Sequence, residues 1–299
     1  MRTLNLLMAL LLMGSSAAYS QDQLTVDESL RPMSKGTQPA FTLNIPQTNL
    51  KDVEKEWMKY IKSGSKEKSV AVGGEIIMPG AVNKNIAAEP FTIYSTLLET
   101  NQGVFLSAWF GLGGDSVFIT RELNNGKDLA AKKYIRDFAI QRYRVAVKAQ
   151  VEIEKGKMKD LEKELKGLEK DEDKANKNIN GYERDIQRSK DQIATNDGDE
   201  KRKGDLVYAQ KTKMDNMNTY EKETLKAAEK VLKTLEKEKE KIQKDSEKEN
   251  RKIDDWNSNI REERRKIDNL KQDQRIKRGQ IADQKKVISE VEQKLKDIK

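Results

Sequence analysis

A long heptad repeat without proline covers more than half of this chain. All five prolines precede residue 91, and the apolar side chains of residues 128–299 recur alternately every four and three residues. Positions of this repeat include Val207, Met214, Leu225, Leu232, Leu235, Ile242, Ile253, Trp256 and Ile260. A period of 3.5 residues sustained over this length is typical of helices that supercoil around one another. The tract therefore predicts a long α-helical coiled coil.

The repeat is interrupted once by residues that favour a turn. Gly198 and Gly204 lie in a polar stretch that also contains asparagine and aspartate, as at many helix ends. We therefore predict a first helix at 127–195, a turn at 196–204 and a longer second helix at 205–299. Helices joined by a short turn pack antiparallel, so the numbers of paired residues would sum to about 400.

This register leaves the end of the second helix without a partner in its own chain. Beyond about residue 265 the first helix is too short to reach it, which makes 261–299 a C-terminal overhang. The candidate interaction seam of the overhang consists of Ile267, Leu270, Ile281, Ile288, Val291, Leu295 and Ile298. The overhang would associate with itself, bind a partner helix or fold back on the N-terminal domain.

Polar residues interrupt the apolar seam and allow two interpretations. They include Lys239, Ser246 and Glu249 in the second helix. One interpretation is a loosely packed, partly hydrated coil, and the other is a hinge near 239–249. A buried polar residue that is paired also sets the register of a coiled coil.

The N-terminus has the pattern of a cleavable secretory signal. Arg2 precedes a short apolar run at residues 4–13, and small residues at 18 and 20 predict cleavage before Gln21. The run is too short to span a bilayer, and no transmembrane segment is predicted in the mature chain. With residues 1–20 as a signal peptide, we expect a periplasmic or secreted protein.

Composition excludes several kinds of site. The chain has no histidine and no cysteine, which removes Ser-His-Asp and Cys-His catalysis, disulfides and the usual zinc ligands. We therefore predict no enzyme, no catalytic residues, no metal site and no cofactor.

The net charge of +8 lies almost entirely in residues 128–299. Alternating Lys and Glu form the ordinary solvated face of a coiled coil. The basic excess at 261–299 makes an anionic envelope polymer or lipid surface an alternative partner. Nucleic acid is not predicted, because the charge is mixed and aromatic residues are sparse along the helices.

A small α+β domain is predicted at 39–126, after a flexible polar lead at 21–38. Asn49 is a candidate N-cap for a helix that ends near Lys62. Strand-like runs lie at 40–45, 69–78, 91–98, 104–110 and 117–120, which gives the order β-α-β-β-β-β. The stretch at 72–75 predicts a bulge, and Pro79-Gly80 predicts a turn.

Trp109 and Phe110 are neighbours in one strand and therefore point to opposite faces of the sheet. Either both are covered, or one is exposed in a pocket for a partner. The predicted layout resembles bacterial envelope adaptors and scaffolds in outline. The sequence thus predicts a non-enzymatic exported coiled-coil scaffold or adaptor that binds a protein partner or itself.

Overall fold

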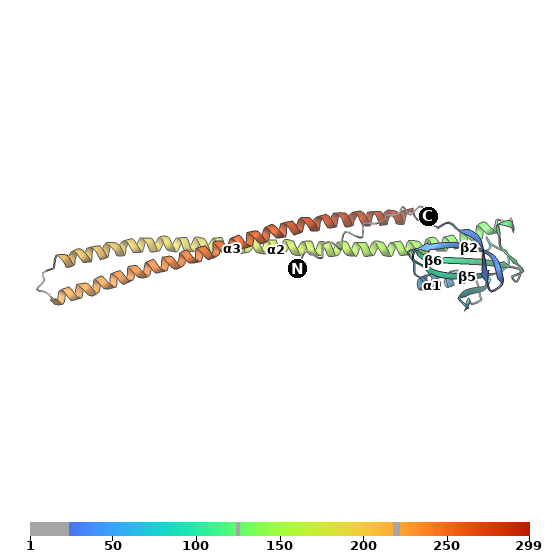
Figure 1. The fold of residues 1–299 in the computed structure, drawn as a ribbon, viewed down its shortest axis with the longest axis horizontal. Helices are drawn as coiled ribbons and strands as arrows, with labels where there is room; N and C mark the ends of the chain where they lie inside the picture. Colours follow the sequence, from blue (N-terminus) through green and yellow to red (C-terminus); the bar gives the residue numbers. More distant parts are fainter. Residues whose placement is uncertain (1–23, 124–125, 218–221) are drawn as a thin grey trace. The chain divides into compact units, whose positions relative to one another are not determined.

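The computed structural model describes residues 24–123, 126–217 and 222–299. It contains an N-terminal antiparallel sheet followed by two long helices (Figure 1). The chain divides into two compact units, which we call the head, up to Lys157 with Gln284–Lys299, and the arm, Met158–Asp283. The predicted signal peptide and its cleavage site lie outside the described residues.

The sheet of the head has seven strands and is antiparallel throughout. Their bounds are β1 Asp27–Met33, β2 Gly36–Pro46, β3 Val70–Val72, β4 Glu75–Ala81, β5 Phe91–Thr100, β6 Gly103–Leu112 and β7 Val117–Phe118. They lie in the order β1-β2-β6-β5-β4-β3, and β7 pairs with β6. A helix, α1 (Leu50–Ile61), follows β2, and a single 3-10 turn at Arg121–Leu123 precedes the long helices.

The predicted flexible lead is wrong where the structure describes it. Residues 27–33 form the edge strand β1, which pairs along its length with β2. The sequence pattern did not predict this strand, because polar residues and Pro32 are untypical of strands. An edge strand tolerates both, because one of its sides makes no ladder hydrogen bonds.

The predicted strand at 69–78 is two strands joined by a tight turn. Gly73 and Gly74 both have positive φ, 61° and 84°, as the central residues of the commonest two-residue hairpin turn do. The pairing of β4 with β5 instead shifts between Met78 and Ala81. The bulge predicted at 72–75 is therefore a turn at Gly73-Gly74, and the turn predicted at Pro79-Gly80 is instead an irregularity in the pairing of two strands.

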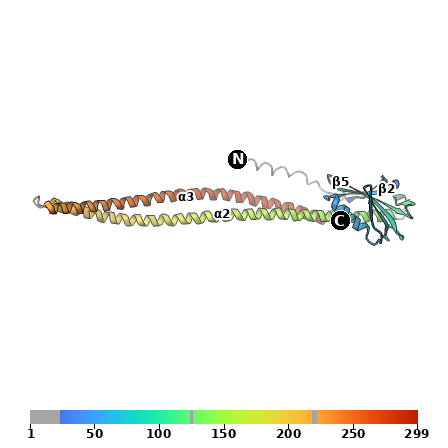
Figure 2. The ribbon, with the colours of Figure 1, turned by 90° about the horizontal axis from the view of Figure 1, so that it is seen from below.

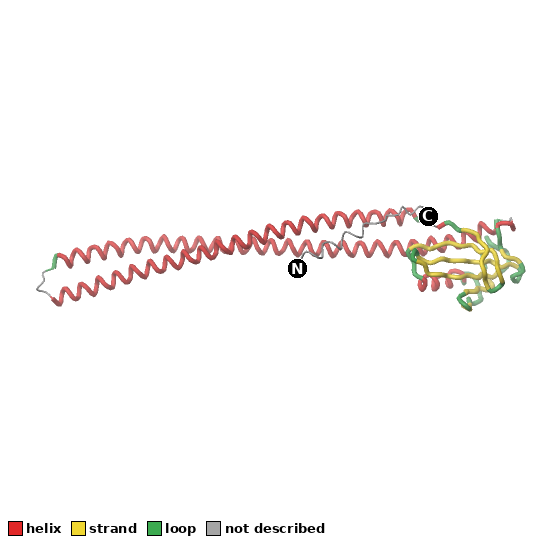
Figure 3. Tube along the Cα trace, viewed as in Figure 1, coloured by secondary structure: helices red, strands yellow, loops and turns green. Residues whose placement is uncertain are grey.

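The main core of the head lies between one face of the sheet and the helices α1 and α2. Trp57 of α1, Phe110 of β6 and Phe138 of α2 are all buried in it. Figure 3 shows the strands grouped beside the start of the long helix. The expectation that the first turns of this helix pack on the sheet is confirmed.

Trp109 and Phe110 do point to opposite faces, and both are covered. Phe110 belongs to the main core, whereas Trp109 packs with Ala40, Tyr94 and Phe118 in a second cluster. The indole Nε1 of Trp109 donates a hydrogen bond to the carbonyl oxygen of Gln38 at 3.1 Å. Neither ring is therefore available as an exposed docking site.

The two long helices have different bounds from those predicted. The first, α2, runs over Lys127–Asp215, and the second, α3, over Lys222–Asp297. The predicted turn at 196–204 is wrong, because these residues lie inside α2. The first helix instead continues to Asp215, and the second begins at Lys222.

Moving the turn changes the register and removes the overhang. In the arm, the side chains of Ser189 and Glu249 are hydrogen-bonded, as are those of Asn178 and Glu263. Their numbers sum to about 440 rather than the about 400 of the predicted hairpin. The second helix is also the shorter one, 76 residues against 89. Figures 1 and 2 show α2 and α3 side by side along the arm.

Candidate functional site

The seam residues predicted for a partner are covered within their own chain. Ile281 and Ile288 are buried, and Leu270 is half-buried. In the arm, Ile267 packs with Ala175, Ile179 and Ile260 of the same chain. In the head, Val291, Leu295 and Ile298 pack against the main core. The seam therefore lines intrachain contacts; only its last three residues lie on the N-terminal domain, where the fold-back alternative placed the whole segment.

Hydrogen bonds hold the end of the chain against α2 in the head. The Nε and one terminal nitrogen of Arg144 donate to the carbonyl oxygen of Ile298 at 3.1 and 2.7 Å. Arg136 donates to the carbonyl oxygen of Lys299 at 3.0 Å. These bonds satisfy carbonyl groups that the end of a helix leaves without partners.

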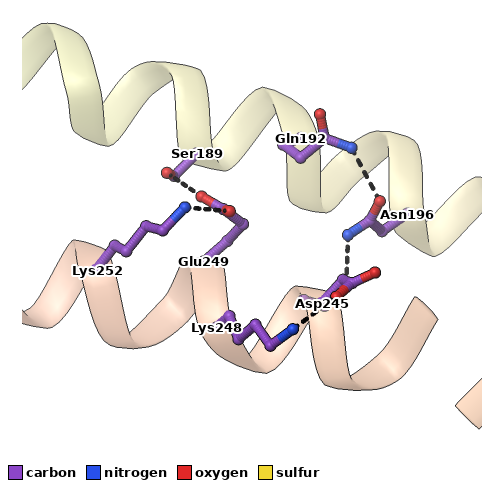
Figure 4. Close-up of polar contacts among 8 residues, drawn as sticks. Ser189, Gln192, Asn196, Asp245, Lys248, Glu249 and Lys252 are labelled. Atoms are coloured by element: carbon purple, nitrogen blue, oxygen red, sulfur yellow. Dashed lines mark hydrogen bonds and ion pairs between the residues drawn. The ribbon is translucent and has the colours of Figure 1, made fainter. Parts of the chain in front are cut away.

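Polar residues in the seam of the arm are paired across it (Figure 4). The Ser189 hydroxyl donates to a carboxylate oxygen of Glu249 at 2.5 Å, and Asn196 donates to the Ser246 hydroxyl at 3.1 Å. Ser189 and Asn196 are buried, so a shift in register would leave them unpaired at a cost of about 1–3 kcal/mol each. The helix α3 is continuous through 239–249. The structure thus shows neither a break in α3 at the predicted hinge nor unpaired polar residues at Ser189 and Asn196, and paired polar residues of this kind set the register.

A half-buried glutamine of α3 and a half-buried carboxylate of α2 make a similar contact in the head. The side-chain amide of Gln284 donates to a carboxylate oxygen of Glu154 at 2.7 Å. Burial alone would raise the pKa of Glu154, but hydrogen bonds from Lys157 and Gln284 outweigh it and lower the pKa. Glu154 therefore remains an ionised acceptor at neutral pH.

The candidate site of the head is a groove between α1 and α2. It has a volume of about 440 Å³. Its lining residues are Gln47, Thr48, Asn49, Asp52, Val53, Arg142, Val145, Ala146, Ala149, Gln150 and Ile153. All of them belong to the head.

The N-terminal turn of α1 forms one wall of the groove. The Asn49 Oδ1 accepts from the backbone N–H of Asp52 at 2.9 Å, and its Nδ2 donates to the Asp52 carboxylate at 2.8 Å. The predicted N-cap is therefore confirmed, and it fixes the start of the helix. Just before it, Gln47 has a φ of +58°, which is uncommon outside glycine. Its N–H donates to the carbonyl oxygen of Gln102 at 3.1 Å, which helps to hold this conformation.

Aromatic and ionic contacts hold this wall against α2. The hydroxyls of Tyr60 and Tyr134 each donate to the backbone carbonyl of the other residue, at 3.0 and 3.3 Å. Burial raises the pKa of Tyr60 to about 12, so this hydroxyl stays protonated and keeps donating. Arg142 lies 3.6 Å from the Glu56 carboxylate and over the Phe138 ring.

The other wall of the groove is an apolar face of α2. Val145 and Ile153 are 53% and 60% exposed, although the helix is otherwise mostly charged on its solvent side. Ala149 lies midway between them. These residues are outside the heptad seam, which in this part of the helix consists of Val147, Val151 and Glu154. The sequence analysis missed them for this reason, and their spacing of four and eight residues was the available signal.

Two buried polar atoms of the groove residues lack partners. They are the Nε of Arg142 and the Oε1 of Gln150. Among the residues that the structure describes, no group of three or more acidic side chains is arranged to hold a metal ion. The groove therefore combines apolar side chains with a few polar atoms that have no hydrogen-bond partner among the described residues.

Comparison with protein families, with curated proteins and with solved structures finds no match to this chain. Within the described ranges, no helix has the length and apolar character that crossing a membrane requires.

Proposed function

We propose that this protein is an exported, non-enzymatic scaffold or adaptor whose head docks a protein while its arm acts as a spacer. The observation that carries the proposal is the exposed apolar face of Val145 and Ile153 beside the groove. Full burial of such a side chain contributes about 1.5–3 kcal/mol, and a docked protein that covered these two half-exposed side chains would recover roughly half of that for each.

The arm fits the proposed role of spacer as an antiparallel coiled coil. Apolar contacts among Ala175, Ile179, Ile260 and Ile267 link the two helices. Ion pairs such as Lys203–Glu238 at 2.6 Å and Lys211–Glu236 at 2.9 Å flank them. Each helix thereby covers the apolar stripe of the other within one chain.

Site-specific photo-crosslinking in the producing cells tests the adaptor role. A photoreactive amino acid replaces Val145 or Ile153, and in the control it replaces Val231, which is 49% exposed in the arm. We expect adducts of defined mass from the two head positions that are absent from the control. Head positions that give no adducts, or the same adducts as Val231, would contradict the proposal.

The alternative function is binding of an anionic envelope polymer or lipid by the basic residues at 261–299. Several of these residues already form ion pairs with α2 in the arm, among them Lys277–Glu164 at 2.6 Å and Arg278–Glu169 at 3.1 Å. Such pairs reduce the charge that is available to an external anion. Binding to anionic vesicles that weakens steeply with added salt would favour this alternative over protein docking.

A further inference from the structure

We propose that the docked protein is a second copy of this chain, which pairs antiparallel through the α2 face centred on Ala149. This inference rests on the proposed docking function and names its partner. It concerns the head alone, since Val145, Ala149 and Ile153 all precede residue 158.

The spacing of the face suits a second helix. Side chains four residues apart on an α-helix differ in direction by about 40° around the helix axis. The three side chains therefore form one nearly straight ridge. Ala149 has the smallest side chain of the three and lies at the centre. A small central residue lets two helices approach closely, while Val145 and Ile153 supply apolar area at each side.

Antiparallel pairing about Ala149 is self-complementary in shape. Residues whose numbers sum to about 298 then lie at the same level, as the two-fold symmetry requires. Val145 of each copy meets Ile153 of the other. Val145 lines the groove together with Ala146 and Arg142. Because the second copy's Ile153 meets Val145, it would lie at the edge of this groove.

The flanking charges complement each other in this arrangement. Lys148 and Glu152 are exposed on the flank of the ridge away from the groove. Neither has an ion pair or hydrogen bond within the parts of the chain that the structure describes. A two-fold axis perpendicular to the two helices brings this flank of one copy beside the same flank of the other. Lys148 then lies within about two residues, or about 3 Å along the axis, of the second copy's Glu152.

A parallel pairing of the same face lacks this complementarity. Its two-fold axis runs along the helices, so the Lys148 flank of one copy would meet the groove flank of the other. Lys148 would then face Gln150 and Ala146 rather than a carboxylate. The antiparallel arrangement is therefore the one that uses both the ridge and the charges.

Sedimentation of the full chain at about 1–100 µM tests the proposal. We expect a dimer that Ile153→Asp weakens at least tenfold and that Val231→Asp leaves unchanged. Because both side chains are exposed, circular dichroism should show that each variant keeps its helices. A wild-type chain that stays monomeric, or a dimer that Ile153→Asp does not weaken, would overturn the proposal.

Charge exchanges and a single introduced cysteine test the orientation. Lys148→Glu and Glu152→Lys should each weaken the dimer, and the double exchange should restore it. Since the chain has no cysteine, Ala149→Cys provides a single thiol at the two-fold axis. Mild oxidation should link two copies through Cα atoms about 6 Å apart, whereas Val231→Cys should not. An Ala149→Cys chain that links no faster than this control contradicts the antiparallel geometry.

The same measurements separate this inference from the proposed function. If the chain is monomeric in solution while positions 145 and 153 crosslink a different protein in cells, the second copy is excluded and the adaptor role stands. If it is monomeric and those positions crosslink nothing, both proposals fail. Crosslinked adducts with twice the mass of the chain, together with a dimer in sedimentation, support both the docking function and the second copy as its partner.

Discussion

Trp57 shows at the scale of one residue how the head is held together. Its side chain is fully buried, and its Nε1 donates to the Ser95 hydroxyl at 2.7 Å. Ser95 in turn donates to the carbonyl oxygen of Ile76 at 3.3 Å. The indole also packs edge-on against Phe138 at 4.8 Å between ring centroids. One side chain therefore links α1, two strands of the sheet and α2.

Trp57→Ala should destabilise the head by about 3–5 kcal/mol, because it opens a large cavity and leaves Ser95 without its donor. Trp57→Phe should cost less, since it keeps most of the packing. Urea unfolding of the full chain followed by circular dichroism measures both. Trp256→Ala in the arm is the control, because Trp256 is only half-buried there. An equal loss in Trp57→Ala and the control would show that this interpretation is wrong.

At the scale of the element, burial outweighed the turn propensity of two glycines. A glycine inside a helix costs about 1 kcal/mol relative to alanine. A turn at 196–204 would leave the seam from Ile281 to Ile298 uncovered, and each large aliphatic residue buried there contributes about 1.5–3 kcal/mol. The helix therefore continues through Gly198 and Gly204 and ends at Asp215.

Gly204→Ala distinguishes the two positions of the turn. Inside a helix, with no atom within 4 Å of the new Cβ, the substitution should stabilise the chain by about 0.5–1 kcal/mol. At a turn with positive φ it would destabilise the chain instead. Gly103→Ala is the opposite control, because its φ is +138° and the new Cβ would clash with the Ile45 carbonyl oxygen. The midpoint of thermal unfolding gives the sign of each change.

At the scale of the whole chain, the C-terminal residues complete the core of the N-terminal domain. Ile298 is buried in the main core of the head together with Val291, and none of the described residues of the intervening arm belongs to this core. A domain built this way depends on contacts between the two ends of the sequence, which form with a large entropic cost of loop closure.

Ile298→Asp should therefore destabilise the head by at least about 2 kcal/mol, because it places a charge in an apolar core. The matched control is Val287→Asp in the same segment, where the side chain is 38% exposed and a charge should be tolerated. Urea unfolding followed by tryptophan fluorescence reports on the head through Trp57 and Trp109. Equal stability of the two variants would show that the C-terminal segment does not contribute to the core.

The elements of this chain follow from short-range patterns, whereas their pairing does not. The spacing of apolar residues predicted two long helices, the Asn49 cap predicted the start of α1, and the strand-like runs at 91–98 and 104–110 predicted β5 and β6. These features depend on residues a few positions apart.

A heptad repeat, in contrast, is compatible with many registers, since each shift by seven residues matches apolar positions again. Only the tertiary structure selected the register, through half-buried polar pairs such as Ser189 with Glu249 and the packing of Ile298 in the core of the head. The same holds for the groove, because Val145 and Ile153 lie off the repeat and become a surface only where α1 packs beside them.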